Sequence, residues 1–164
     1  MIPENLTKVK RSQFGTYLDV TPAGSTPTWK ILGIGITDLS IDFNPQVETE
    51  KWIVEDTARN DHTGNEKQAS VSQKIYKGDD CFEFVYGGLN ELNYKTHILD
   101  VDRWNGTGTT YPATLSDGLI TITNYMGDDA VIEYDLLYDG DPKKGTVTYD
   151  ENGVPTFTET QASL

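Results

Sequence analysis

The chain has little of what disulfide-linked, membrane-spanning or secreted proteins need. Cys81 is its one cysteine, which excludes an internal disulfide framework. No apolar run approaches the roughly 20 residues that span a bilayer. The N-terminal residues also lack the basic and then apolar segments of a secretory signal. These absences predict a protein that is made and folded in a cytoplasm and does not enter a membrane.

Positive charge is also scarce. The chain has 13 basic and 26 acidic residues, a net charge of -13. Nucleic-acid binding depends largely on Lys and Arg contacts to phosphates, with release of counterions, so the composition argues against tight binding of DNA or RNA. The acidic excess is either a solubilising surface or a surface past which a polyanion moves without being held. The composition is compatible with both interpretations of the acidic excess.

Catalytic motifs are absent or broken. Gly33-Ile34-Gly35 is followed by Asp38 where a dinucleotide-binding fingerprint requires glycine. Cys81 stands after two aspartates, which oppose thiolate formation, so a small core residue is expected there rather than a nucleophile. The many carboxylates include no pair that its context marks as a glycosidase site. We therefore predict that the protein is not an enzyme and uses no cofactor.

Metal-binding patterns fail in the same way. His97 points to the opposite face of its predicted strand from Asp100 and Asp102, so these three side chains do not converge. His62, beside an aspartate in a predicted loop, is expected at the surface. Asp139-Gly140-Asp141 is followed by a proline and two lysines, which breaks the spacing of a calcium-binding loop. No metal site is predicted.

What the chain does have is a pattern of short alternating strands. Its 164 residues suit a single domain over 1–164, and 15 glycines and many threonines suit a β-rich fold with frequent turns. One helix is predicted after the N-cap residue Asp79, with an apolar face of Phe82, Val85, Tyr86 and Leu89. The sequence predicts a β-sandwich or half-barrel with one short flanking helix. Its strands are expected at 14–20, 29–34, 36–43, 68–76, 96–104, 119–125, 130–138, 146–149 and 154–158.

The segment between residues 36 and 77 is the most informative. Two alternating runs, at 36–43 and 68–76, enclose a polar loop at 46–66, which is far longer than a usual hairpin connection. The loop carries an apolar patch, Trp52-Ile53-Val54, that a solvated loop would not normally expose, so we expect it to dock on another subunit. Residues 1–12 are polar, with a basic cluster, and are expected to form a flexible arm.

The order of these features resembles a known family. Ser40-Ile41-Asp42-Phe43-Asn44-Pro45 is followed by Glu48-Thr49-Glu50 and by the run from Trp52 to Ala58. A return strand, Tyr76-Lys77-Gly78-Asp79 and the helix come next. This order is similar to that of the major tail protein, or tail tube protein, of long-tailed bacteriophages and prophages of Gram-positive bacteria. The likeness covers roughly residues 30–138 and is best over 36–84.

The resemblance implies a tube-forming subunit of the virion. Proteins of that family fold as a β-sandwich or half-barrel with a flanking helix and form hexameric rings, whose inner strands join into one barrel and which stack along the tail. A long loop bridges subunits and rings, and an acidic lumen lets DNA pass without specific binding. The implied partners are further copies of the chain, the tape measure protein, and the tail terminator and distal tail proteins. No C-terminal Ig-like domain is expected here.

Specific residues are assigned to these surfaces. If the runs at 36–43 and 130–138 line the lumen, strand alternation sends Leu39, Ile41, Phe43, Ile132, Tyr134 and Leu136 to the core. The residues expected in the N-terminal arm contacts are Lys8, Lys10 and Arg11, which should meet an acidic neighbour. Those expected to line the lumen are Asp38, Asp42, Glu133 and Asp135. Those expected in the bridging loop are Glu48, Glu50, Trp52, Ile53, Val54, Glu55, Asp56 and Arg59.

Two alternatives remain at this point. The first is the tube protein of a contractile tail or related injection machine, which would share the ring architecture. The second, from another class, is a carbohydrate- or host-binding β-sandwich that would use exposed aromatics such as Trp104 and Tyr111.

Overall fold

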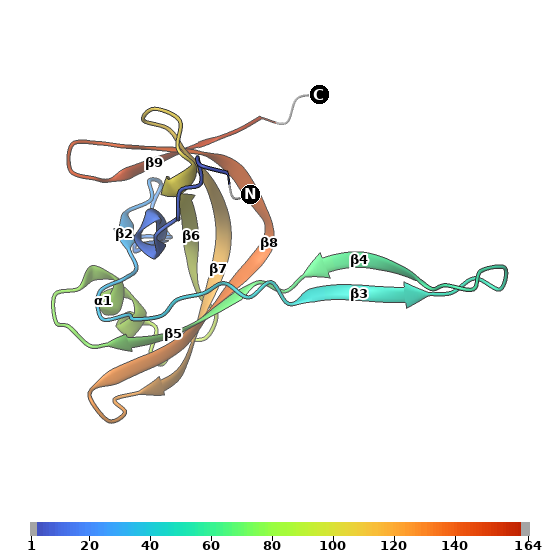
Figure 1. Cartoon of the computed structure of the whole chain (residues 1–164). Helices are drawn as coiled ribbons and strands as arrows, with labels where there is room; N and C mark the ends of the chain where they lie inside the picture. Colours follow the sequence, from blue (N-terminus) through green and yellow to red (C-terminus); the bar gives the residue numbers. More distant parts are fainter. Residues whose placement is uncertain (1–2, 162–164) are drawn as a thin grey trace.

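The computed structural model describes residues 3–161, which form a strongly curled β-sheet, one α-helix and a long hairpin that leaves the body (Figure 1). Two short 3-10 helices lie at Arg11–Gln13 and Arg103–Asn105. The α-helix is α1 (Asp80–Gly87). The strands are β1 (Phe14–Asp19), β2 (Trp29–Ile31), β3 (Pro45–Glu50), β4 (Arg59–Asn65), β5 (Gln68–Lys74), β6 (Tyr94–Asp102), β7 (Tyr111–Tyr125), β8 (Val131–Tyr149) and β9 (Pro155–Glu159).

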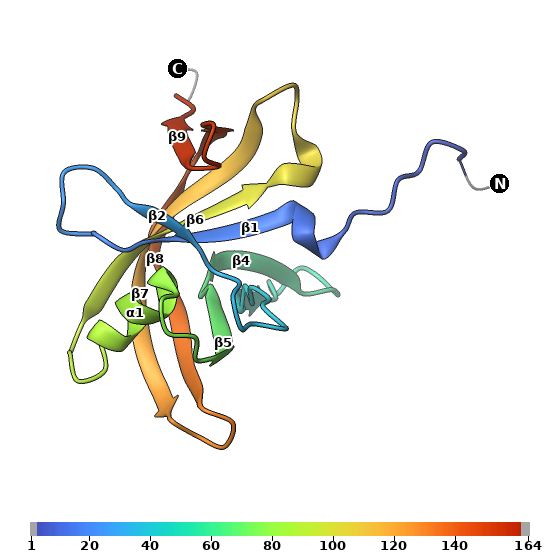
Figure 2. The ribbon, with the colours of Figure 1, turned by 90° about the vertical axis from the view of Figure 1, so that its left-hand side faces the viewer.

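The main sheet is antiparallel, in the order β2-β1-β6-β7-β8-β5, and β9 also pairs with β8. β8 has 19 residues, enough for its first half to pair with β5 and its second half with β9. β7 pairs with both halves of β8 from the other side. The sheet curls into a half-barrel (Figures 1 and 2). This confirms the predicted mainly β half-barrel with one short helix.

The larger hydrophobic core lies between one face of the sheet, α1 and the segment before the hairpin. Leu18, Ile98, Ile132 and Leu136 are completely buried there, and Tyr134 is 1% exposed. Burying a side chain of this size contributes about 1.5–3 kcal/mol to stability. The prediction that Ile132, Tyr134 and Leu136 face the core is confirmed.

A second core lies on the opposite face of the same sheet. Leu99 and Val101 follow Ile98 with the alternation of a strand and are buried with Tyr17, Trp29, Ala113 and Val147. The curl of the sheet brings the second half of β8 over this face. The Tyr17 and Tyr149 hydroxyls lie 3.3 Å apart as a result. Both faces of the central strands are thus covered by the chain itself.

Helix α1 begins where the sequence predicts. The Asp79 carboxylate accepts a hydrogen bond from the Cys81 backbone N–H at 3.3 Å, which caps the first turn. Phe82 and Val85 are buried, as predicted, but Tyr86 is 46% exposed and packs against Tyr125 at the rim. Placing Tyr86 on the buried face was therefore wrong.

The predicted strand at 36–43 does not form. The segment is extended but irregular, and its backbone pairs with β5 only at its ends, where Gly35 C=O accepts from Lys74 N–H and Asp42 forms a bridge with Gln68. Gly35 has a φ of 75°, and a Cβ there would lie 2.5 Å from the Lys74 carbonyl oxygen. The close approach of Gly35 to the Lys74 backbone therefore requires a left-handed conformation at Gly35, which ends strand geometry where the segment begins.

This segment still contributes to the core, but with fewer residues than predicted. Leu39 is buried and Ile41 is partly buried against the larger core. Phe43 is 53% exposed, so its assignment to the core was wrong. Its ring instead lies under the ammonium of Lys67, 5.1 Å from the ring centroid, at the root of the hairpin.

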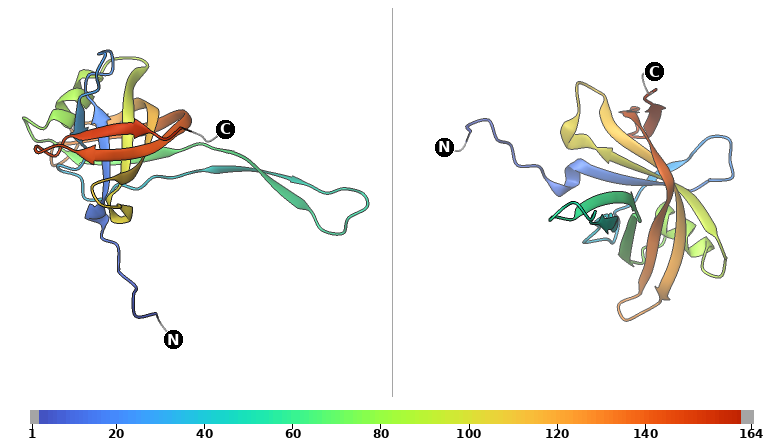
Figure 3. Two further views of the ribbon diagram at one scale, coloured as in Figure 1. Left: turned by 90° about the horizontal axis from the view of Figure 1, so that it is seen from above. Right: turned by 90° about the vertical axis from the view of Figure 1, so that its right-hand side faces the viewer.

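The predicted loop at 46–66 is also not a loop. Residues Pro45–Glu50 and Arg59–Asn65 pair as an antiparallel hairpin, so only residues 51–58 form its tip. The hairpin extends well beyond the half-barrel, as the view from above shows (Figure 3, left). A long polar segment with no apolar alternation carries no strand signal in its sequence, but backbone pairing alone makes it a two-stranded ribbon.

Candidate assembly surfaces

The hairpin carries an apolar tip. At residues 51–58 Ile53 is 102% exposed, Val54 84% and Trp52 48%. The Arg59 guanidinium lies 4.3 Å from the centroid of the Trp52 ring and pairs with the Glu55 carboxylate. These contacts hold the tryptophan against the hairpin while the two aliphatic side chains remain in solvent.

The strands below the tip are acidic and solvated. All six residues of β3 are exposed, and so is almost all of β4. Among the described residues Glu48, Glu50 and Asp61 form no ion pair, since the ion pair of the hairpin joins Glu55 to Arg59. The eight residues predicted for the bridging loop therefore all lie on this hairpin or at its tip. They are Glu48, Glu50, Trp52, Ile53, Val54, Glu55, Asp56 and Arg59.

A second surface is the polar face of β7, β8 and β5. Ser70 stands opposite Asp135, and Ser72 stands opposite Glu133. The Ser70 hydroxyl donates to the Asp135 carboxylate at 2.8 Å. Thr121 stands opposite Asp135 on the other side and belongs to the same face. The result is a surface of small hydroxyl side chains and carboxylates, backed by the larger core.

The four acids predicted to line the lumen do not all share this surface. Glu133 and Asp135 lie on it, and Asp42 stands opposite Gln68, next along the same face of β5. Asp38 lies elsewhere, in a groove that it shares with Arg11 and Arg103. The irregular course of residues 36–41 accounts for the difference, because strand alternation does not apply there.

Two edges of this polar face have free backbone groups. Gln68 and Lys74 turn their backbone groups away from β8, towards Asp42 and Gly35. Backbone groups alternate in direction along an antiparallel strand, so the N–H and C=O groups of Ser70 and Ser72 also point away from β8. They have no backbone hydrogen-bond partner within residues 3–161. At the other edge β6 ends opposite Ile120, which leaves 121–125 of β7 paired on one side only.

The N-terminal segment is the third surface. Residues 3–10 have no helix or strand, are exposed, and lead away from the body (Figure 2). The chain becomes fixed at Arg11, whose guanidinium donates to the carbonyls of Phe14 at 3.0 Å and Leu39 at 2.9 Å. Of the predicted arm contacts, Lys8 and Lys10 are therefore on the projecting part and Arg11 is at its base. Residues 1 and 2 of the predicted arm lie outside the described residues.

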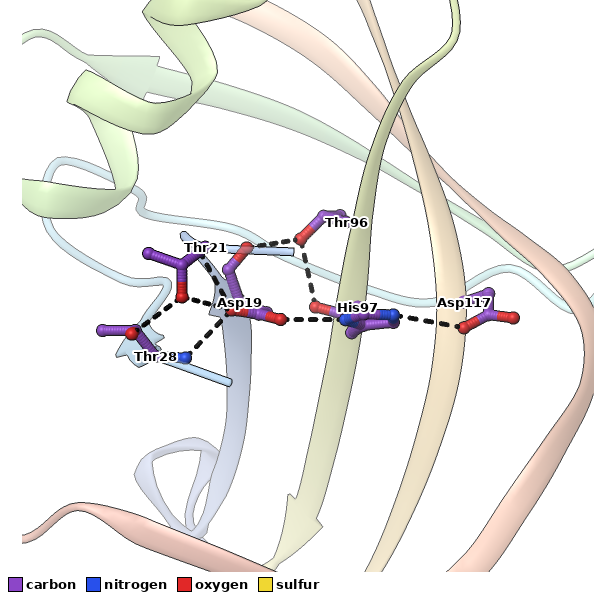
Figure 4. A network of polar contacts seen from close by, with 6 residues as sticks. All are labelled: Asp19, Thr21, Thr28, Thr96, His97 and Asp117. Carbon is purple, nitrogen blue, oxygen red and sulfur yellow. Dashed lines mark hydrogen bonds and ion pairs between the residues drawn. The ribbon is translucent and has the colours of Figure 1, made fainter. Parts of the chain in front are cut away.

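A polar network beside the second core has a structural role (Figure 4). Asp19 is 1% exposed, and its Oδ1 accepts from the backbone N–H groups of Thr21 and Thr28, which closes the loop between β1 and β2. Its Oδ2 lies 2.8 Å from His97 Nδ1, and His97 Nε2 lies 3.6 Å from Asp117. Burial opposes ionisation of Asp19, but the hydrogen bonds from His97, Thr28 and Thr21 outweigh it and lower its pKa.

Two other buried groups have equally structural surroundings. Burial, with the nearby Asp79 and Asp80, raises the pKa of the Cys81 thiol to about 12, so the thiolate nucleophile does not form near neutral pH. This confirms the prediction of a core cysteine. Asp100 accepts from the hydroxyls of Thr16 and Tyr138, and burial raises its pKa. Within the described residues no three His, Cys, Asp or Glu side chains are placed to hold a metal ion.

The aromatic pair considered for sugar binding is not a platform. Trp104 is 48% exposed, but Tyr111 packs edge-on against Tyr149 in the second core, 5.6 Å between ring centroids. For the part of the chain that the structure describes, no helix is long and apolar enough to cross a membrane.

Comparisons with known proteins find likeness in structure but not in sequence. No protein-family model matches the sequence, and it matches no curated protein. Among solved structures, the chain is similar to a chain of the anti-feeding prophage baseplate, from a cryo-EM structure with six-fold symmetrisation. The two share 10% sequence identity with a TM-score of 0.47, over 85% of this chain and 96% of that chain.

Proposed function

We propose that the chain is a structural subunit of a phage-like tail, which assembles with copies of itself into stacked hexameric rings around a channel for DNA. The observation that carries the proposal is the apolar tip of the hairpin. Ile53 and Val54 are in solvent at the end of a hairpin that contributes no residue to either core of the described part of the chain. Such side chains are buried only by another molecule.

The sheet edges supply a way to close a ring. If the Ser70–Ser72 edge of β5 pairs with the edge of β7 at 121–125 in the next copy, the three strands β7, β8 and β5 continue from subunit to subunit. This arrangement satisfies the free backbone groups and removes the exposed edges, which are a general liability of open sheets. Repeating one heterologous contact closes a ring when the rotation allows it.

The polar face then becomes the wall of the channel. Asp42, Glu133 and Asp135 share it with serine and threonine hydroxyls. In a closed ring each acidic position recurs once per subunit, so phosphates are repelled from every side. Lys74 is at the end of the same face of β5, but the three carboxylates outnumber it, so DNA finds few counterion-releasing contacts that would retain it. The sequence resemblance to tail tube proteins supports the same arrangement.

Electron microscopy of the purified protein tests the proposal. The wild-type chain should form tubes of stacked rings at high concentration. A variant in which a short Asn-Gly turn replaces residues 47–63 should remain folded, because these residues are exposed and outside both cores. It should form no tubes. Tubes of normal length from this variant would contradict the proposal, and so would a wild-type protein that stays monomeric at every concentration.

A further inference from the structure

The base of the N-terminal segment forms a groove that contains two of the three arginines of the chain. The groove has a volume of about 420 Å³ and lies between residues 11–14, residues 31–39 and Arg103. We call it the arginine groove. Arg59, the third arginine, is on the hairpin and has its own carboxylate partner. Arg11 and Arg103 form no ion pair with any described residue.

The two guanidinium groups are held in place but not neutralised. Arg11 donates to the carbonyls of Phe14 and Leu39, and Arg103 donates to the Ser12 carbonyl at 2.9 Å. Arg103 Nε is buried and has no hydrogen-bond partner among the described residues. Asp38 shares the groove but pairs with neither arginine. Such a site has unused donors and a net positive charge on a chain whose net charge is -13.

We propose that the arginine groove binds the acidic strands of the hairpin of a second copy of this chain. The hairpin presents Glu48, Glu50 and Asp61, all exposed and without an ion pair among the described residues. It leaves its own body (Figures 1 and 3). A fixed guanidinium fork facing an exposed carboxylate is the arrangement that forms a charge-assisted contact. Lys8 and Lys10, which precede Arg11 in the chain, add long-range attraction for the same partner.

This inference rests on the proposed function and names where the hairpin of one subunit binds on the next. It couples the two projecting elements of the molecule, because the N-terminal segment that carries the lysines also forms one wall of the groove. A neighbouring hairpin that fills the groove would therefore contact residues 8–14 along its acidic strands and leave its apolar tip free to reach beyond the groove.

Cysteine crosslinking between two kinds of full-length copies tests the inference. Copies with Ser12→Cys are mixed with copies with Glu50→Cys under mild oxidation. Cys81 is completely buried and does not compete. We expect a disulfide-linked pair at a yield well above that of a matched control, in which Thr109→Cys, an exposed loop position, replaces Ser12→Cys. Equal yields from the two mixtures would overturn the inference.

Charge changes then test the contact itself. Arg11→Gln and Arg103→Gln, added together to the Ser12→Cys copy, should lower the crosslink yield at least about tenfold, since the loss of one charge-assisted hydrogen bond alone is worth about that factor. Arg103→Lys is a milder second variant that keeps the charge and loses the fork, in case the double change prevents folding. Without any further change, the yield should also fall as salt is added. A yield that responds neither to salt nor to the arginine changes would overturn the inference.

The outcome is separable from that of the proposed function. Tubes formed by the wild-type chain without the Ser12–Glu50 crosslink would overturn the arginine groove alone. A salt-sensitive crosslink from a chain that never forms tubes would support the contact between copies while contradicting the tube.

Discussion

Replacing Ile53 and Val54 with serine should separate folding from assembly. Both side chains are almost fully in solvent, at 102% and 84% exposure, and lie outside both cores. Surface changes of this kind alter the free energy of unfolding by about 0.5 kcal/mol or less. The melting temperature of the double variant should therefore stay close to that of the wild type.

Assembly should respond strongly to the same change. Burying an aliphatic side chain of this size contributes about 1.5–3 kcal/mol, so the two together contribute about 3–6 kcal/mol for each tip that docks. Since every 1.4 kcal/mol is a factor of ten in an equilibrium constant, the protein concentration needed to form tubes should rise at least about a hundredfold.

The assay is the concentration above which the protein pellets as tubes, measured with circular dichroism melting on the same samples. Leu92→Ser is the matched control, because Leu92 is 91% exposed but lies on the body, between α1 and β6. It should leave both measurements unchanged. An unaltered pelleting threshold for the Ile53/Val54 variant would show that the tip stays in water in the assembly and would refute the reasoning.

Three further predictions concern the body of the protein. Asp19→Asn should lower the free energy of unfolding by about 1–3 kcal/mol at pH 7. The Asp19 carboxylate, whose pKa is lowered in the fold, stabilises it only while ionised, so the difference should shrink as the pH falls below the ordinary pKa of 3.8. Urea unfolding at several pH values measures this. Tyr134→Phe removes the hydroxyl that donates to Gln73 Oε1 at 2.8 Å and should cost about 1–3 kcal/mol, measured by urea unfolding against the exposed control Tyr76→Phe. Replacing Asp42 and Asp135 with lysine should leave tube formation largely intact but slow genome passage, which ejection kinetics would measure; unchanged kinetics would mean that these side chains do not control passage.

Local sequence signals located part of the body well, although the strands predicted at 130–138 and 146–149 are both within β8 and the one predicted at 119–125 begins at Tyr111. β5 alternates between buried Ala69 and Val71 and exposed Ser70 and Ser72, so its strand and both of its faces could be predicted. The turn at Asn152-Gly153 places the β8–β9 hairpin for an equally local reason, since Gly153 has a φ of 75°. These signals succeed because one face of each element is buried by the chain itself.

Alternation failed where contacts far along the chain decide the conformation. Residues 36–43 alternate as cleanly as β5, yet they are held to β5 only at their two ends. Nothing local in the run indicates that Gly35 makes a close contact with the backbone of Lys74. The arginine groove was missed for the same reason: Arg11 and Arg103 are distant in sequence, and only the pairing of β1 with β6 brings their surroundings together. The basic cluster of Lys8, Lys10 and Arg11 was the one available signal, and it gave no indication of Arg103.

The hairpin, to which we assign the contacts between copies, is also the part of the fold that the sequence predicted least well. β3 and β4 have no buried face, so no hydrophobic alternation in the sequence could predict them. A two-stranded hairpin without a hydrophobic face is only marginally stable in water. Its ladder gains from any surface that buries its tip or neutralises Glu48 and Glu50. Because the core of the chain neither specifies nor stabilises this hairpin, its sequence is free to suit a partner.

If that partner is a second copy, ring assembly should order the hairpin. Amide hydrogen exchange at 45–50 and 59–65 should then slow markedly from monomer to tube, while exchange in β6 stays unchanged. Equal exchange in both states would mean that the hairpin contacts nothing in the assembly.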